Sequence, residues 1–195
     1  MAEATTEKSV TPEQLAKLLR YDPDTGKLYW LPRSLEFFRD SGGRYTPERA
    51  KKIFDTTFAD KEALTARNPA GYARGNLFGR NVMAHRAAFC LMTGSWPKQQ
   101  VDHINGLRDD NRWVNLREAN NRQNQQNSAS AKGSSSKYVG VALCKRSLRW
   151  SAYICPDGTK IHLGNFRSEE LAARARDKAA KEMFGPYARL NFPEE

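Results

Sequence analysis

The sequence predicts an α+β protein made of separate modules, and three features support this fold class. Residues 100–127 follow the order strand, loop, strand and helix. Residues 137–185 contain three runs with strand alternation, which suggest an antiparallel sheet packed on the single alanine-rich helix that follows them. SASAKGSSSK, residues 128–137, is small and polar and cannot bury much apolar surface, which is typical of a flexible linker.

Composition predicts a folded protein that acts inside the cell. Of the 195 residues, 39% are hydrophobic and 28% are charged, which is typical of a soluble globular chain. No run of eighteen or so apolar residues occurs, and the start MAEATTEKSV lacks the layout of an export signal. We therefore expect an intracellular location and no membrane partner.

The charge balance predicts a polyanionic partner. A formal net charge of +10 attracts phosphate at long range but does not separate DNA from RNA or from anionic lipid. The three cysteines, Cys90, Cys144 and Cys155, form no CxxC pair, which argues against a disulfide framework and a cysteine zinc site. We expect reduced thiols.

The region 1–69 predicts a helix and an extended segment, and its role is uncertain. TPEQLAKLLRY has Thr11 as a helix cap and places Leu15, Leu18 and Leu19 on one face. Turn chemistry follows at residues 22–26, and residues 27–30 have an extended pattern. Residues 34–68 are charged and weakly periodic, and no role is assigned to them.

The next module, residues 70–127, begins with a predicted hairpin and helix. The hairpin turns at residues 78–80, and the helix runs from about His85 to Gly94. At the centre of the module, Asp102 and His103 follow each other on a predicted strand, so alternation points their side chains to opposite faces. Many asparagines follow, and they are either turn and capping residues or ligands around a reactive histidine.

The interpretation of these asparagines as ligands around a reactive histidine has a chemical rationale. Hydrolysis of a phosphodiester near neutral pH requires an activated water and positive charge at the leaving oxygen. A histidine, which ordinarily has a pKa of about 6.5, suits the first task. A carboxylate together with an amide oxygen suits a hard divalent cation such as Mg²⁺ or Mn²⁺.

These residues carry a resemblance over residues 70–127. DHINGLRDDNRWVNLREANNRQNQQN resembles the HNH, or ββα-metal, homing-type endonucleases of phages and introns. The resemblance implies that His103 is the general base, that Asn115 holds its ring, and that Asp102 and Asn124 bind the metal. Many relatives have histidine at the position of Asn124, so this chain would use a weaker, neutral oxygen ligand.

The other polar residues of this module have plainer roles. Asn105, Asn111, Asn120 and Asn121 are expected to form turns and caps. His85 is expected to pack or to cap its helix. Arg108 and Arg112 are candidates for DNA phosphate contacts, and pairing with Asp109 or Asp110 is an equally good alternative.

Residues 138–195 form the predicted sheet-and-helix module. Its helix starts at the cap Ser168 and ends at Gly185, and we expect an inner face of Leu171, Ala175, Ala179 and Met183. YVGVALC, IHLGNF and LNFP resemble the Apetala or ethylene-response-factor DNA-binding domain. The resemblance implies that a sheet face lies in the DNA major groove. The candidate contacts are Lys145, Arg146, Arg149, Trp150, Tyr153, Lys160 and His162.

Several of these positions have alternative interpretations. Val139, Ala142 and Cys155 replace base-reading arginines of the plant proteins, and His162 replaces a tryptophan, which implies looser sequence preference and more backbone binding. Trp150 is as well suited to the core as to DNA. Lys145 and Arg146 also fit a solvated turn.

The sequence thus predicts an intracellular, metal-dependent endonuclease for duplex DNA that needs no small-molecule cofactor. It would be of homing type and phage-encoded, acting in the cytoplasm of a bacterial host. The alternatives are a DNA-binding regulator with an inactive nuclease fold and an RNA-directed protein. Oligomeric state, target sequence, and nicking as against double-strand cutting do not follow from the sequence.

Overall fold

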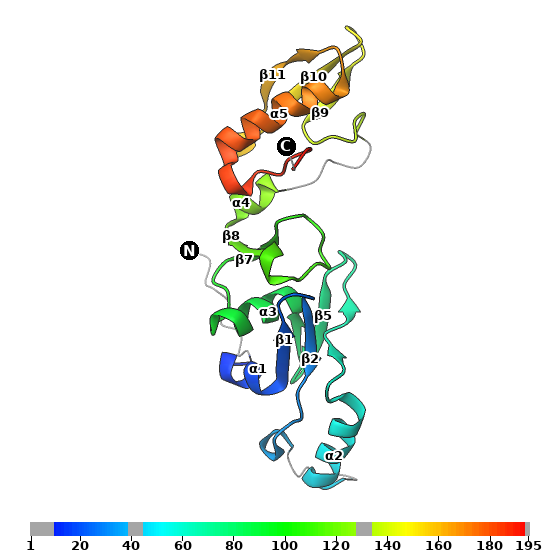
Figure 1. Ribbon diagram of the computed structural model, residues 1–195, viewed down its shortest axis with the longest axis vertical. Coiled ribbons are helices and arrows are strands. Elements are labelled where there is room, and N and C mark those ends of the chain that lie inside the picture. The colour runs from blue at the N-terminus through cyan, green and yellow to red at the C-terminus, as the bar shows by residue number, and fades with distance from the viewer. Residues whose placement is uncertain (1–9, 39–44, 128–133, 194–195) are drawn as a thin grey trace. The chain divides into compact units, whose positions relative to one another are not determined.

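The computed structural model describes residues 10–38, 45–127 and 134–193, and its small sheets and separate helices confirm the α+β class (Figure 1). The chain divides into two compact units. The first comprises Met1–His103 and Leu107–Glu118, and the second comprises Ile104–Gly106 and Ala119–Glu195. Most of the predicted linker, residues 128–133, lies outside the described residues. None of the described helices is both long enough and apolar enough to span a membrane.

The first unit begins with helix α1 (Pro12–Leu18). Thr11 caps it, and Gln14 completes a capping box by accepting a hydrogen bond from the Thr11 backbone. The helix ends earlier than the sequence suggested, because Leu19 already pairs with Trp30 across an antiparallel hairpin. The hairpin consists of strands β1 (Leu19–Asp22) and β2 (Lys27–Trp30).

Residues 34–68, to which the sequence analysis assigned no role, contain short elements in their described parts, 34–38 and 45–68. They are a 3-10 turn at Leu35–Phe37, helix α2 (Pro47–Phe58), and strands β3 (Glu62–Ala63) and β4 (Ala66–Arg67). Strand β3 extends the β1–β2 hairpin into a three-stranded sheet. Helix α2 has no buried residue, although Ala50, Ile53, Phe54 and Phe58 recur at helical spacing along one side of it.

The predicted second hairpin and its helix are present. Strands β5 (Ala73–Leu77) and β6 (Arg80–Met83) turn through Phe78 and Gly79, which both have positive φ. Helix α3 (Ala84–Thr93) follows and ends at Gly94 in the left-handed conformation. A buried core joins α1, α3 and the two sheets, and its largest buried side chains are Leu15, Leu18, Leu19, Leu77 and Cys90.

The asparagine-rich segment has the predicted order of strand, loop, strand and helix. Strand β7 (Gln100–His103) pairs with β8 (Leu116–Ala119), and a 3-10 turn at Trp113–Asn115 leads into β8. Helix α4 (Asn121–Gln126), which belongs to the second unit, is capped by Asn120. Ala88 of α3, Val101 and Leu116 form a buried cluster that anchors the β7–β8 pair.

The second unit has the predicted three-stranded antiparallel sheet with one helix packed on it (Figure 1). The strands are β9 (Val141–Cys144), β10 (Arg149–Ile154) and β11 (Ile161–Phe166), with β10 in the middle. Helix α5 (Glu169–Phe184) begins after the cap Ser168 and ends at Gly185. Short 3-10 turns lie at Pro156–Gly158 and Gly185–Tyr187.

The predicted inner face of α5 is wrong for Leu171 and Met183, although Ala179 does pack against the buried cluster of Ile154, Ala180 and Phe184. Leu171 and Met183 are 52% and 50% exposed. The buried residues lie on the adjacent face and are Ala172, Ala173, Arg176, Asp177, Ala180 and Phe184. Alanines at 172, 173 and 180 let the helix approach the sheet more closely than leucine or methionine would, so small side chains rather than large apolar ones mark the contact.

Asp177 ties the segment around Asn191 to α5. Its carboxylate accepts hydrogen bonds from the Asn191 backbone N at 2.7 Å, the Phe192 backbone N at 2.9 Å and Asn191 Nδ2 at 3.0 Å. It also pairs with buried Arg176 at 3.3 Å. Asn191 in turn hydrogen bonds both the N–H and the carbonyl of Val139, the residue that leads into β9.

Replacing Asp177 with Ala should therefore destabilise the second unit by about 3–5 kcal/mol, because three donors and a buried guanidinium lose their acceptor. Urea unfolding followed by circular dichroism measures this change. Asp157→Ala is the matched control, because the exposed Asp157–Arg122 pair should contribute no more than about 1 kcal/mol. Equal unfolding free energies for the two variants would contradict the role of Asp177.

Candidate active site and sheet surface

Strand β7 carries Asp102 and His103 at consecutive positions. Both are buried, with 6% and 3% of their surface exposed. Their contacts differ, as strand alternation predicts: Asp102 pairs with Arg117 on β8, whereas His103 contacts Asn111 and the rings of Tyr72 and His85. The two side chains therefore have different surroundings although they are neighbours in the sequence.

The imidazole of His103 is held by an amide. Its Nε2 lies 3.0 Å from Asn111 Oδ1, and Asn111 is 6% exposed. Because an amide oxygen can only accept a hydrogen bond, this contact selects the tautomer that carries its proton on Nε2. That neutral tautomer has its basic lone pair on Nδ1, which is the arrangement that a general base requires.

Two further rings surround His103. The ring centroids of His85 and Tyr72 lie 5.2 Å and 5.8 Å from that of His103, and those of His85 and Tyr72 lie 5.1 Å apart. Burial lowers the pKa of His85 to about 3, with further contributions from His103 and Arg86. His85 is therefore neutral at pH 7 and adds no positive charge beside His103.

The carboxylate of Asp102 faces a cation of the protein itself. Arg117 Nε and Nη2 lie 3.0 Å and 2.8 Å from Asp102 Oδ2, and both side chains are largely buried. The two charge-assisted hydrogen bonds fix the orientation of the carboxylate, while the cost of desolvating both charges offsets much of their attraction. No group of three or more His, Cys, Asp and Glu side chains suited to a metal occurs in the described part of the chain.

The two other predicted site asparagines lie on separate elements. Asn115 lies at the end of the 3-10 turn before β8 and donates from Nδ2 to the Asp110 carbonyl at 2.7 Å. Asn124 lies on α4 and belongs to the second unit, whereas Asp102 and His103 belong to the first. The roles predicted for Asn115 and Asn124 therefore stay predictions.

The two arginines of the loop differ in their contacts. Arg112 forms a bidentate pair with Asp110, with distances of 2.7 Å and 2.6 Å, which raises the pKa of the guanidinium. Arg108 instead donates to the Ala70 carbonyl at 2.6 Å, and its guanidinium lies 5.1 Å from the centre of the Tyr72 ring. For Arg112, the structure thus has the alternative that the sequence left open, pairing with a nearby aspartate.

The sheet surface of the second unit carries a connected polar and aromatic group. The rings of Tyr153 and His162 lie 5.1 Å apart, and Lys160 Nζ lies 3.8 Å from the centre of the Tyr153 ring. His162 Nε2 and Ser151 Oγ both contact Asn165 Oδ1, at 3.3 Å and 2.6 Å. These contacts bring together three of the predicted DNA-binding residues, Tyr153, Lys160 and His162.

The remaining predicted contacts have other surroundings. Lys145 and Arg146 are exposed in the turn between β9 and β10, and Arg149 is exposed at the start of β10. Trp150 is partly buried and packs against the apolar cluster of Val141, Ala152, Ala172 and Ala173. Its indole therefore contributes to the core between sheet and helix, which is the alternative that the sequence left open.

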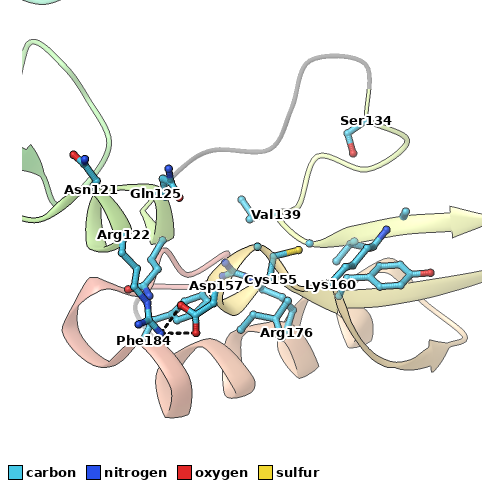
Figure 2. A pocket seen from close by; sticks show the side chains of 17 residues that line it. Asn121, Arg122, Gln125, Ser134, Val139, Cys155, Asp157, Lys160, Arg176 and Phe184 are labelled. Carbon is cyan, nitrogen blue, oxygen red and sulfur yellow. Dashed lines mark hydrogen bonds and ion pairs between the residues drawn. The ribbon is translucent and has the colours of Figure 1, made fainter.

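A cavity of about 700 Å³ lies in the second unit between α4 and the sheet (Figure 2). Arg122 of α4 reaches Asp157, with a shortest distance of 2.6 Å. The cavity wall includes Val139, Ala142 and Cys155, the three positions where the resemblance expects arginine. The cavity therefore adjoins the surface that the resemblance assigns to DNA.

Sequence reasoning missed three functional candidates of the first unit. Asn111, assigned to a turn, contacts His103, and Arg117 pairs with Asp102. His85, assigned to packing or capping, is indeed buried, but it lies against the ring of His103. A signal for Arg117 existed, because it lies on a strand expected beside that of Asp102. Nothing in the spacing distinguished Asn111 from the other asparagines.

Comparisons with known proteins match two parts of the chain to different families. Residues 82–126 match the family model described as HNH endonuclease. The chain is also 41% identical over 58 residues to AP2-like ethylene-responsive transcription factor TOE2 of Arabidopsis thaliana, which is 30% of this chain and 12% of that protein.

Other plant proteins match similarly short stretches. APETALA2-like protein 2 of Oryza sativa subsp. indica is 41% identical over 58 residues, 30% of this chain and 13% of that protein. Dehydration-responsive element-binding protein 2A of Arabidopsis thaliana is 56% identical over 36 residues, 18% of this chain and 11% of that protein. The chain thus spans only a small part of these relatives. It joins an HNH endonuclease segment, residues 82–126, to an AP2-like segment.

Proposed function

We propose that this chain is a metal-dependent endonuclease that hydrolyses phosphodiester bonds in duplex DNA, by nicking one strand or cutting both. The observation that carries the proposal is the imidazole of His103, held through Nε2 by Asn111, on the strand that also carries the buried Asp102. Both residues lie within the segment that matches the HNH endonuclease model. We further propose a phage-encoded homing enzyme that acts inside a bacterial cell.

In the proposed reaction, Nδ1 of His103 takes a proton from water. The resulting hydroxide oxygen forms a bond to phosphorus, and the bond from phosphorus to the 3′-oxygen breaks with its electron pair on that oxygen. The 3′-oxygen then takes a proton from solvent, which leaves 3′-hydroxyl and 5′-phosphate ends. Asn111 supports this step by keeping the ring proton on Nε2, and Asn115 remains our second candidate for holding the histidine.

Asp102 and Asn124 are the proposed ligands of Mg²⁺ or Mn²⁺. A carboxylate and an amide supply the oxygen donors that these hard cations prefer, so the donor set fits such an ion. The ion would supply positive charge for the leaving 3′-oxygen. Arg117 shares the carboxylate of Asp102, which lowers the net negative charge available to a cation there.

The sheet of the second unit is the proposed surface for holding DNA. Tyr153, Lys160 and His162 offer stacking and phosphate contacts, and the exposed Lys145, Arg146 and Arg149 add positive charge. The similarity to plant proteins whose names specify transcription factors and element binding supports this assignment. Arg108 and Arg112 are proposed to contact phosphate near the cleaved bond, Arg112 after releasing Asp110.

A second candidate function is a DNA-binding regulator with an inactive nuclease fold. The Arg117–Asp102 pair favours it, since a guanidinium occupies the carboxylate that the metal would need. Nicking of supercoiled plasmid by the whole chain, with Mg²⁺ or with EDTA, separates the two candidates. We expect nicking that EDTA abolishes. Plasmid binding without nicking in any divalent cation would favour the regulator, and preferential binding or cleavage of structured RNA would overturn the choice of DNA.

A further inference from the structure

We propose that Tyr21 is a positioning residue for His103 and that it acts through the loop that carries Asn111. This inference rests on the proposed role of His103 as the general base. It gives the hairpin β1–β2, from the region whose role the sequence left uncertain, a part in the active site. All of the residues involved lie in the first unit.

The β1–β2 hairpin, including its turn, contacts the loop around Asn111 at three points. The Tyr21 hydroxyl donates to the Asn111 carbonyl at 2.6 Å, and the Trp113 backbone N donates to the Pro23 carbonyl at 3.0 Å. Gly26 packs so tightly that a Cβ there would lie 2.5 Å from Arg112 N and 2.6 Å from the Asn111 carbonyl carbon. Because these contacts are made to backbone atoms, they fix the path of the loop rather than a single side chain.

Tyr21 is itself firmly anchored. Its ring packs against both buried apolar clusters of the first unit, and its neighbour Leu19 is 2% exposed. Burial, with the negative charges of Asp22 and Asp110 nearby, raises the pKa of the Tyr21 hydroxyl well above its ordinary range. The hydroxyl therefore stays protonated and remains a hydrogen-bond donor.

Asn111 connects this loop to the imidazole ring of His103. Asn111 is held at its carbonyl by Tyr21, and its side-chain oxygen contacts His103 Nε2 at 3.0 Å. A shift of the Asn111 backbone would move the amide away from the imidazole and weaken the selection of the Nε2–H tautomer. Displacement of a catalytic group by about 1 Å can cost about a hundredfold in rate, so this support is expected to matter for the chemical step.

Tyr21→Phe tests the inference, because it removes the hydroxyl and keeps the ring. We expect kcat for plasmid nicking to fall by about tenfold while KM stays within about twofold, since the contact does not touch DNA. Tyr29→Phe is the matched control: Tyr29 lies on β2, and its hydroxyl makes no hydrogen bond with any residue that the structure describes. This control should keep the wild-type kcat.

A second measurement does not depend on cleavage. The chain has three histidines, so ¹⁵N NMR of the imidazole rings can report the tautomer of each when all are neutral. We expect His103 to carry its proton on Nε2 in the wild type and to populate the Nδ1–H form in the Tyr21→Phe variant. Gly26→Ala, which displaces the same loop from another side, should produce the same change if that variant folds.

The outcomes are distinguishable. An inactive wild type whose His103 tautomer still responds to Tyr21→Phe would refute the nuclease function and leave the positioning intact. An active wild type with unchanged kcat and unchanged His103 tautomer in a folded Tyr21→Phe variant would overturn the positioning role alone.

Discussion

Replacement of His103 with Ala is expected to reduce plasmid nicking by at least about a thousandfold. The variant loses the only group that we propose for removing a proton from water, and general-base catalysis typically contributes about 10²–10⁴-fold. DNA affinity should stay near that of the wild type, because the proposed binding surface lies on the sheet of the second unit. Nicking rates at saturating protein and gel-shift affinities measured in parallel test both expectations.

His162→Ala is the complementary variant. His162 lies on the exposed sheet surface, where its ring contacts Tyr153. We expect it to weaken DNA binding and to leave the nicking rate at saturation unchanged. A His103→Ala variant that cleaves at the wild-type rate would remove the assignment of the base. Loss of DNA affinity in that variant would show instead that residue 103 serves binding.

Replacement of Asp102 with Asn should reduce nicking by about a hundredfold or more and raise the Mn²⁺ concentration needed for half-maximal rate. A neutral amide attracts a divalent cation less strongly than a carboxylate does. Asp109→Asn is the matched control, since Asp109 is 57% exposed and pairs with Arg67 at 3.4 Å. That control should change neither quantity. A Mn²⁺ dependence of Asp102→Asn that matches the wild type would exclude Asp102 as the ligand.

The pair with Arg117 allows stability to be separated from catalysis. Asp102→Asn leaves a buried guanidinium without its charged partner, which typically costs about 3–5 kcal/mol. The double variant Asp102→Asn/Arg117→Gln removes both charges and should regain part of the unfolding free energy. Nicking should remain low in it. Recovery of nicking together with stability would mean that residue 102 acts by supporting the fold.

Sequence features that act locally predicted most of the elements. Thr11 and Ser168 mark helix starts, because a capping side chain meets its partners within three residues. The turn was predictable from Gly79, since glycine adopts a positive φ readily, whereas Phe78 takes a positive φ that its side chain disfavours. The strand, loop, strand and helix order of residues 100–127 was predictable for the same reason, since each segment has its own periodicity.

Features that depend on distant partners were not predictable. Leu19 begins a strand because it pairs with Trp30, although its apolar character also suits the preceding helix. The inner face of α5 follows from the closeness of the sheet, which selects alanines over Leu171 and Met183. The selection of Asn111 as the partner of His103 depends on the fold of the whole loop, to which residues 21–26 contribute from far away in the sequence.

The hydrogen bonds that join Asn191 to Asp177 and to Val139 have a consequence for biosynthesis. Val139 and Asn191 are held together although 52 positions separate them, so the segment that precedes β9 cannot complete its native contacts until residue 191 has left the ribosome. The first unit has its own buried core and can fold earlier, since units with their own core generally fold as they emerge. A nascent chain stalled before residue 191 would therefore have a folded first unit and a second unit that still lacks the hydrogen bonds of Asn191.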